Sequence, residues 1–164
     1  MTRLQNNGKS PTLKIISVGN DLYGDDGIGT AILKKAKEYS AFANTPLIDC
    51  ATDALSIIDH FQDAEHVLII DAAKMGEPPG SVKLFDATKA KLLIKTDHLS
   101  VHGISLTETM KIAKRIGVYP QTVTIMGIEP EQLSVNRGLS STVSDAIPTA
   151  LAKLIEFQST LHLN

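Results

Sequence analysis

The sequence of 164 residues contains no tryptophan and one cysteine, Cys50. One cysteine excludes an internal disulfide and a thiolate metal cluster, and it is typical of a protein from a reducing compartment such as the cytoplasm. No histidine lies near Cys50 in the sequence, so we expect a small buried apolar side chain there and not a nucleophile.

Charge of one sign and long apolar runs are also scarce. The formal net charge is −2, and no run of basic residues exceeds two. This pattern argues against binding to nucleic acid or to an anionic membrane surface. No apolar run approaches the roughly 20 residues of a membrane span, and the N-terminus lacks the apolar region of a signal peptide. We therefore expect a cytoplasmic protein with one domain and a flexible tail at residues 1–12.

The sequence does contain apolar segments with the length and β-branching of strands, alternating with segments of helical periodicity. The predicted strands are 13–18, 46–50, 66–70, 81–85 and 122–126. The predicted helices are 28–41, 53–61, 105–115 and 142–158, and Pro148 should kink or restart the last one. Alternation of this kind predicts an α/β fold, a three-layer αβα sandwich with a twisted, mainly parallel sheet of about five strands.

Acidic residues follow two of the predicted strands. Asp25 and Asp26 come after the first strand, Asp71 ends the third, and His102 lies in a long polar segment before the next helix. If the first and third strands are neighbours, their carboxylates meet at one edge of the sheet, and an added imidazole completes a ligand set for a divalent ion such as Zn, Ni, Mn or Fe. Each residue also has an ordinary explanation, because a helix cap, a strand end or a loop histidine needs no metal.

Other candidates for chemistry are weaker. The turn GNDLYGDDGIG lacks the G-x-G-x-x-G spacing of a dinucleotide site, and its carboxylates would repel phosphate. His98 is a possible further ligand, and Ser100 beside His102 is a chance neighbour. Glu108 is expected to act in a helix cap and Glu129 as a loop charge.

Four segments in order resemble the hydrogenase maturation proteases, nickel-dependent endopeptidases that remove the C-terminal tail from the large subunit of [NiFe] hydrogenases. They are GNDLYGDDGIG, IIDAAKMGEPPG, LSVHGISLTETM and GIEPEQLSVNRGLSSTVSDAIP. The resemblance extends from about residue 13 to residue 154. It implies a twisted sheet between helices of the phosphorylase/hydrolase type.

The resemblance also implies a site. In that family a carboxylate of the first motif, an aspartate after the third strand and a loop histidine bind the metal, and these fall on Asp26, Asp71 and His102. Either the nickel takes part in cleavage, or it arrives on cysteines of the precursor and is sensed by these residues; another divalent metal can substitute. Asp25 would orient the turn or accept a proton. The implied partner is the large-subunit precursor, with segments 72–103 and 127–139 as docking surface.

Two alternatives stay open. The acidic pair and Asp71 also resemble a phosphoacceptor receiver domain with a Mg²⁺ site, although Gly127 and Ile128 stand where a receiver needs a lysine and a receiver has no use for His102. The other alternative is a non-catalytic scaffold that only binds the precursor.

Overall fold

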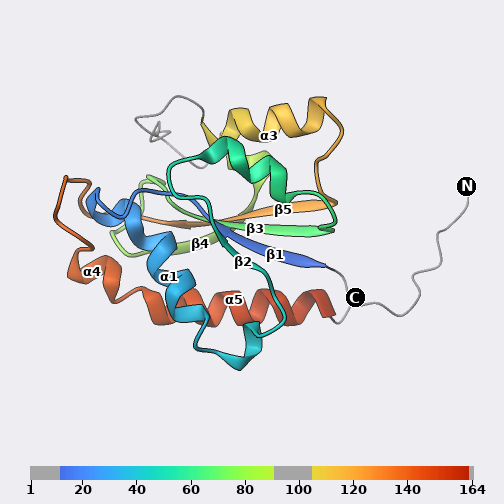
Figure 1. Cartoon of the computed structure of the whole chain (residues 1–164). Helices are drawn as coiled ribbons and strands as arrows, with labels where there is room; N and C mark the ends of the chain where they lie inside the picture. The colour runs from blue at the N-terminus through green and yellow to red at the C-terminus, as the bar shows by residue number, and fades with distance from the viewer. Residues whose placement is uncertain (1–11, 91–104, 163–164) are drawn as a thin grey trace, which may run out of the picture.

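The computed structural model describes residues 12–90 and 105–162. Five strands form one twisted sheet in the order β2-β1-β3-β5-β4 (Figure 1). Four of them are parallel, namely β1 (Leu13–Ser17), β2 (Leu47–Asp49), β3 (His66–Ala72) and β5 (Thr122–Ile128). The edge strand β4 (Val82–Asp86) pairs antiparallel with β5. The predicted mainly parallel sheet of about five strands is confirmed.

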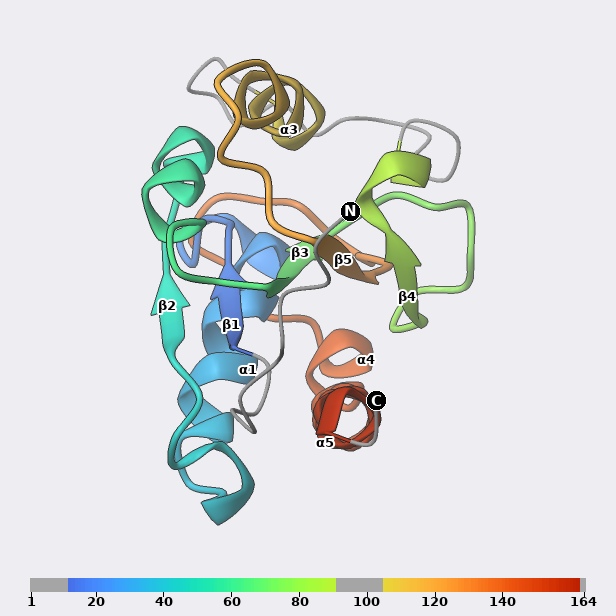
Figure 2. The ribbon, with the colours of Figure 1, turned by 90° about the vertical axis from the view of Figure 1, so that its right-hand side faces the viewer.

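Helices cover both faces of this sheet (Figure 2). In β3, Val67 and Ile69 face one apolar cluster and Leu68 and Ile70 face the other, because alternate residues of a strand point to opposite sides. The first cluster is covered by η3 (Ala54–His60) and α3 (Leu106–Arg115), and the second by α1 (Ile28–Ala36), α4 (Ser141–Ser144) and α5 (Ile147–His162). The three-layer αβα sandwich is therefore also confirmed.

The signals at several helix ends act as the sequence predicts. The Ser105 side chain accepts a hydrogen bond from the Glu108 N–H at 3.2 Å, which caps α3. Beyond α3, Gly117 takes a left-handed backbone conformation with φ 77°. Pro148 is the second residue of α5, so the predicted last helix is divided into α4 and a restarted α5.

Two predicted helices are wrong in detail. The first ends at Ala36 and not at residue 41, because the chain turns there and enters the short helix η2 (Ser40–Phe42), in which Phe42 is buried while Tyr39 before it is 40% exposed. The second is a 3₁₀-helix, η3, in which Ile57 is buried and Leu55 is 41% exposed. Asp53 still caps it by accepting from the Ser56 N–H at 3.2 Å.

Among the described residues, no helix has the length and apolar character needed to cross a membrane.

Candidate functional site at the carboxyl edge of the sheet

The register of the sheet places the two predicted acidic segments at one edge. β1 and β3 are parallel neighbours with Ser17 opposite Ile70, and the Val18 N–H donates to the Ile70 carbonyl at 3.1 Å. Asp71 is the next residue of β3. The turn after β1 leads into η1 (Gly24–Gly27), which contains Asp25 and Asp26 and packs against β3. Both segments therefore lie at the carboxyl edge, where open α/β sheets place ligands.

A tightly packed turn fixes the position of Asp26. The Asn20 N–H donates to Asp26 Oδ2 at 2.7 Å, and the Asp26 N–H donates to the Tyr23 carbonyl at 3.3 Å. Gly19 makes this packing possible, because a Cβ there would lie 2.0 Å from the Asp26 carbonyl oxygen, and its φ of 139° disfavours other residues. The Asp26 side chain is half-buried.

The neighbouring Asp25 has a different role, although its carboxylate is adjacent in the sequence. Asp25 is fully buried, and among the described residues its two side-chain oxygens accept hydrogen bonds from the segment after β5. The donors are the N–H groups of Glu131 at 2.9 Å, Gln132 at 2.8 Å and Ser140 at 2.6 Å, and the Ser140 hydroxyl at 3.0 Å. This geometry supports the predicted role of Asp25 in orienting the turn.

Asp71 lies on the face of the sheet that α3 covers. Alternate residues of β3 share a face, so Asp71 lies on the same side as Val67 and Ile69, which pack in the cluster of α3 and η3. The α3 helix runs back from the side of this edge toward the start of β5, so its N-terminal end lies on the side of the carboxyl edge (Figure 1). His102, which precedes Ser105 by three positions in the sequence, lies outside the described residues, as do His98 and Ser100.

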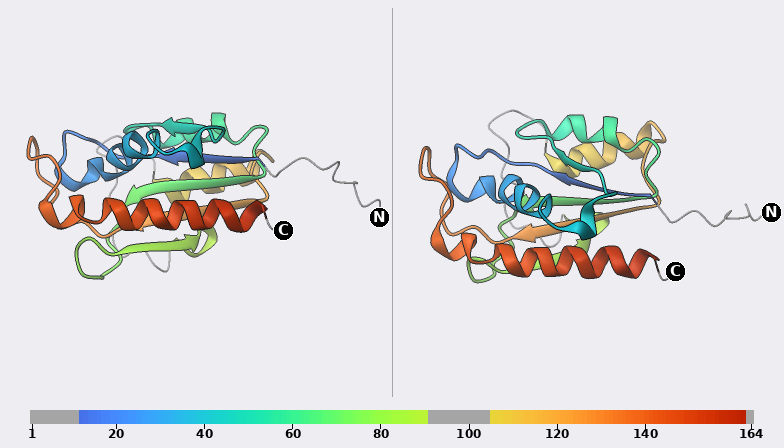
Figure 3. Two further views of the ribbon diagram at one scale, coloured as in Figure 1. Left: turned by 90° about the horizontal axis from the view of Figure 1, so that it is seen from below. Right: turned by 60° about the horizontal axis from the view of Figure 1, so that its bottom comes forward.

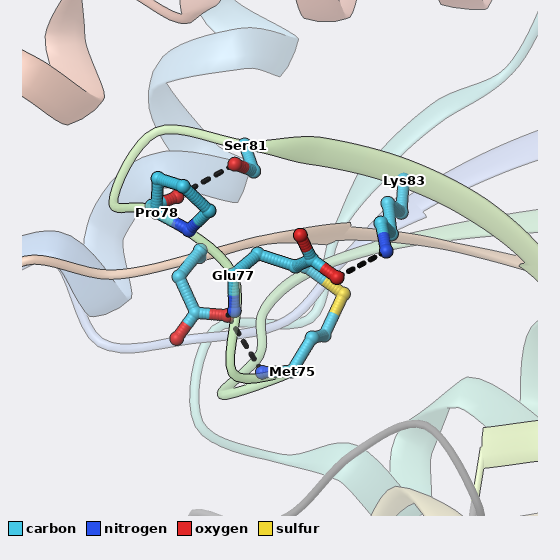
Figure 4. Close-up of polar contacts among 6 residues, drawn as sticks. Met75, Glu77, Pro78, Ser81 and Lys83 are labelled. Carbon is cyan, nitrogen blue, oxygen red and sulfur yellow. Dashed lines mark hydrogen bonds and ion pairs between the residues drawn. The ribbon is translucent and has the colours of Figure 1, made fainter.

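Glu129 is a charged residue of the loop after β5, as predicted, but it has a structural role that the sequence did not indicate. It is buried directly after β5, and its Oε2 accepts hydrogen bonds from the Met75 N–H at 2.7 Å and the Glu77 N–H at 3.2 Å. These bonds hold the turn between β3 and β4, where Glu77 also pairs with Lys83 and the Ser81 hydroxyl donates to the Pro78 carbonyl at 2.6 Å (Figure 4). A carboxylate immediately after a strand with an apolar run at its end is the sequence signal that could have indicated this role.

Asp25 and Glu129 together order both segments that follow the central strands. Asp25 holds residues 131–140, and Glu129 holds the turn at residues 75–77. A buried carboxylate is costly unless hydrogen bonds compensate it, and here main-chain N–H groups provide that compensation. The edge of the sheet is thus a rigid frame around Asp26 and Asp71.

The donor chemistry of this edge suits a divalent ion. Asp26 and Asp71 supply hard oxygen atoms, and an imidazole would add the nitrogen that Zn, Ni, Mn and Fe accept. Within residues 12–90 and 105–162, no three acidic, histidine or cysteine side chains gather as a metal site. The predicted third ligand, His102, falls outside those ranges, so the ligand set stays a prediction.

Cys50 has the predicted structural role. It is buried at the end of the β2 region, in the cluster covered by α3 and η3. Burial raises the pKa of its thiol above the ordinary value, which disfavours the reactive thiolate.

The fold and this acidic edge define an α/β protein whose site lies at the carboxyl ends of the central strands. The family model for hydrogenase maturation proteases matches residues 30–157. The hydrogenase expression/formation protein HoxM of Cupriavidus necator is 30% identical over 138 residues, which cover 80% of this chain and 68% of HoxM. The hydrogenase 2 maturation protease of Escherichia coli is 25% identical over 143 residues, 86% of this chain and 87% of that protein.

A solved structure gives the same result. The solution structure of an endopeptidase from Escherichia coli superposes with a TM-score of 0.76 at 25% identity, covering 87% of this chain and 89% of that one. The chain belongs to the hydrogenase maturation protease family and is a hydrolase of peptide bonds. Its sheet also differs from that of a receiver domain. A receiver domain has the strand order 2-1-3-4-5, whereas this sheet has the order β2-β1-β3-β5-β4, and its edge strand β4 is antiparallel.

Proposed function

We propose that this protein removes the C-terminal extension of a [NiFe] hydrogenase large-subunit precursor after nickel has been inserted. In this proposal Asp26, Asp71 and His102 bind or sense the metal. The observation that supports it most directly is the parallel pairing of β1 with β3, which gives the turn of Asp26 and the strand end of Asp71 one common edge.

Each protein group has a stated task in this proposal. The Asn20 N–H fixes the orientation of the Asp26 carboxylate, and Asp25 fixes the backbone beside it. Asp71 adds a second carboxylate from β3, and His102, three positions before Ser105 in the sequence, would add the imidazole. When bound, a divalent ion supplies Lewis acidity for the peptide carbonyl and lowers the pKa of bound water.

The experiment that tests the proposal combines purified protein with purified precursor. The protein is first passed through a chelator, and precursor with and without nickel is then added. We expect the precursor to lose its tail by mass spectrometry only when it contains nickel. Processing by chelator-treated protein would favour nickel carried by the precursor, whereas a need for metal added to the protein would favour a resident catalytic ion.

Matched variants separate the site from the fold. Asp71→Asn and His102→Ala should each reduce processing by about 100-fold or more, the order of magnitude for loss of a group that supports metal-assisted catalysis. The controls are Asp63→Asn and His162→Ala, which alter exposed side chains away from this edge. Wild-type rates in both site variants would contradict the proposed ligands. Full binding of the precursor by wild-type protein with no cleavage at all would favour the non-catalytic scaffold.

A further inference from the structure

Two aliphatic side chains project into solvent beside the candidate site. Leu22 and Val135 are each 65% exposed, the highest values among the large apolar side chains of the described residues. They come from the turn after β1 and from the segment after β5, which are joined by a hydrogen bond from the Asn136 N–H to the Leu22 carbonyl at 2.9 Å and by a β-bridge between Tyr23 and Val135. We call Leu22 and Val135 the apolar tip.

The backbone under the apolar tip is fixed. On one side the Leu22 N–H donates to the Asn20 side chain at 3.0 Å, and on the other Asp25 holds residues 131–140 at both ends. Gly24 lets the two segments approach, because a Cβ there would lie 2.8 Å from the Gln132 carbonyl oxygen. Binding through a fixed surface loses little conformational entropy, so this exposure is suited to docking.

The apolar tip lies beside the candidate site. It is continuous with the Asp26 turn, since the Asp26 N–H donates to the carbonyl of Tyr23, the residue after Leu22. The described chain begins before β1 and ends with α5 at the opposite edge of the sheet (Figure 3). The first and last described residues therefore do not cover the apolar tip, whereas a protein substrate that is cut at this edge must pass beside it.

We propose that the apolar tip inserts into an apolar groove of the hydrogenase large-subunit precursor, adjacent to the bond that is cleaved. This inference rests on the function proposed above. Tyr23 and Val135 are paired across the isolated antiparallel bridge, and Leu22 lies in the turn directly before Tyr23. Two exposed aliphatic side chains on a small turn fit insertion into a groove better than contact with a flat surface.

The test measures processing kinetics of nickel-loaded precursor by Leu22→Ser, Val135→Ser and the double variant. We expect KM to rise about ten-fold for each substitution, which corresponds to about 1.4 kcal/mol of binding free energy, while kcat stays within about two-fold of wild type because Asp26 is not displaced. The conservative variants Leu22→Met and Val135→Leu should keep the wild-type KM, since they preserve apolar surface.

Ile116→Ser is the matched control. Ile116 is 59% exposed but follows α3 at the opposite edge of the sheet, so the KM of the Ile116→Ser variant should equal that of wild type. An unchanged KM in the double variant, or an equal rise in Ile116→Ser, would overturn the inference. Conversion of a dimer into a monomer by the double variant, seen by sedimentation without precursor, would also overturn it, since the tip would then bind a second copy.

The two proposals fail in different ways. If wild-type protein does not process nickel-loaded precursor, the proposed function is wrong and the apolar tip has no substrate to bind. If wild-type protein processes the precursor and the double variant does so with an unchanged KM, only the docking inference is wrong. The docking inference can also be tested without cleavage. Precursor binding is then measured for Asp71→Asn protein and for Asp71→Asn protein that also carries the tip substitutions, and equal affinities would contradict the docking inference.

Discussion

Ser140 and Asp25 are 115 positions apart in the sequence, yet the Ser140 N–H lies 2.6 Å from Asp25 Oδ1 and its hydroxyl lies 3.0 Å from Oδ2. The same hydroxyl accepts a hydrogen bond from the Val143 N–H at 3.3 Å and so caps α4. One residue therefore connects the turn after β1, the segment after β5 and the first turn of a helix. The rigidity of the acidic edge depends on this connection.

Asp25→Asn should lower the free energy of unfolding by about 2 kcal/mol. The amide nitrogen of asparagine would replace one acceptor oxygen, so the main-chain N–H groups that face it would lose their hydrogen-bond partner. Urea denaturation measures this change. Asp59→Asn is the control, since Asp59 is exposed and the substitution should stay within about 0.5 kcal/mol of wild type. Equal midpoints for the two variants would show that the Asp25 hydrogen bonds do not hold the segment.

Glu129 offers a second comparison, because a single oxygen accepts both of its hydrogen bonds. Glu129→Gln keeps a carbonyl oxygen for the Met75 and Glu77 N–H groups and should cost less than about 1 kcal/mol, whereas Glu129→Ala leaves both donors without it and should cost about 2 kcal/mol. Thermal unfolding of both variants tests this order. The reverse order would indicate that the charge of Glu129, and not its acceptor oxygen, stabilises the turn.

The sequence could predict the layers of this fold because the signals for them are local. A run such as Val67 to Ile70 is apolar at every position, as expected for a strand covered on both faces, and all four side chains are fully buried. The pairing of β1 with β3 followed from the usual order of such sheets. The sequence alone therefore places the two acidic segments at one edge of the sheet.

The details that the sequence could not predict depend on distant partners. Glu129 looks like a loop charge because its donors, Met75 and Glu77, lie 54 and 52 positions away. The first helix was predicted too long because its periodicity continues to Tyr39, and only tertiary packing shows that Phe42 fills that part of the core. Leu22 and Val135 carry no local signal at all, since their proximity arises from the bridge between their segments.

Tyr119 should make stability depend on pH in the alkaline range. Burial, with a smaller contribution from Asp86, raises its pKa from 10.0 to about 12. The unfolded chain then releases this proton at lower pH than the folded protein, so the stabilisation present below pH 10 is lost as pH rises toward 12. Urea denaturation between pH 9 and 12 should show a flatter decline for Tyr119→Phe, which keeps the ring contact with Phe61. Parallel curves for the two proteins would exclude this assignment.

Gly19→Ala should damage the candidate site more than the rest of the fold. The added Cβ would lie 2.0 Å from the Asp26 carbonyl oxygen, and the φ of 139° is itself unfavourable for alanine. Relief of this clash requires the Asp26 backbone to move, so we expect a loss of about 3 kcal/mol in stability and a loss of processing activity.

Comparison with Gly117→Ala separates the effect of the Cβ clash on stability from the effect of the positive φ. Gly117 also has a positive φ, 77°, but a Cβ there meets nothing within 4 Å. This variant should lose only about 1 kcal/mol and should process nickel-loaded precursor at the wild-type rate. Both variants are compared by thermal unfolding and by precursor mass after a fixed time. If Gly19→Ala keeps full activity at a temperature where it is folded, then Asp26 tolerates displacement and cannot be a residue whose position the reaction requires.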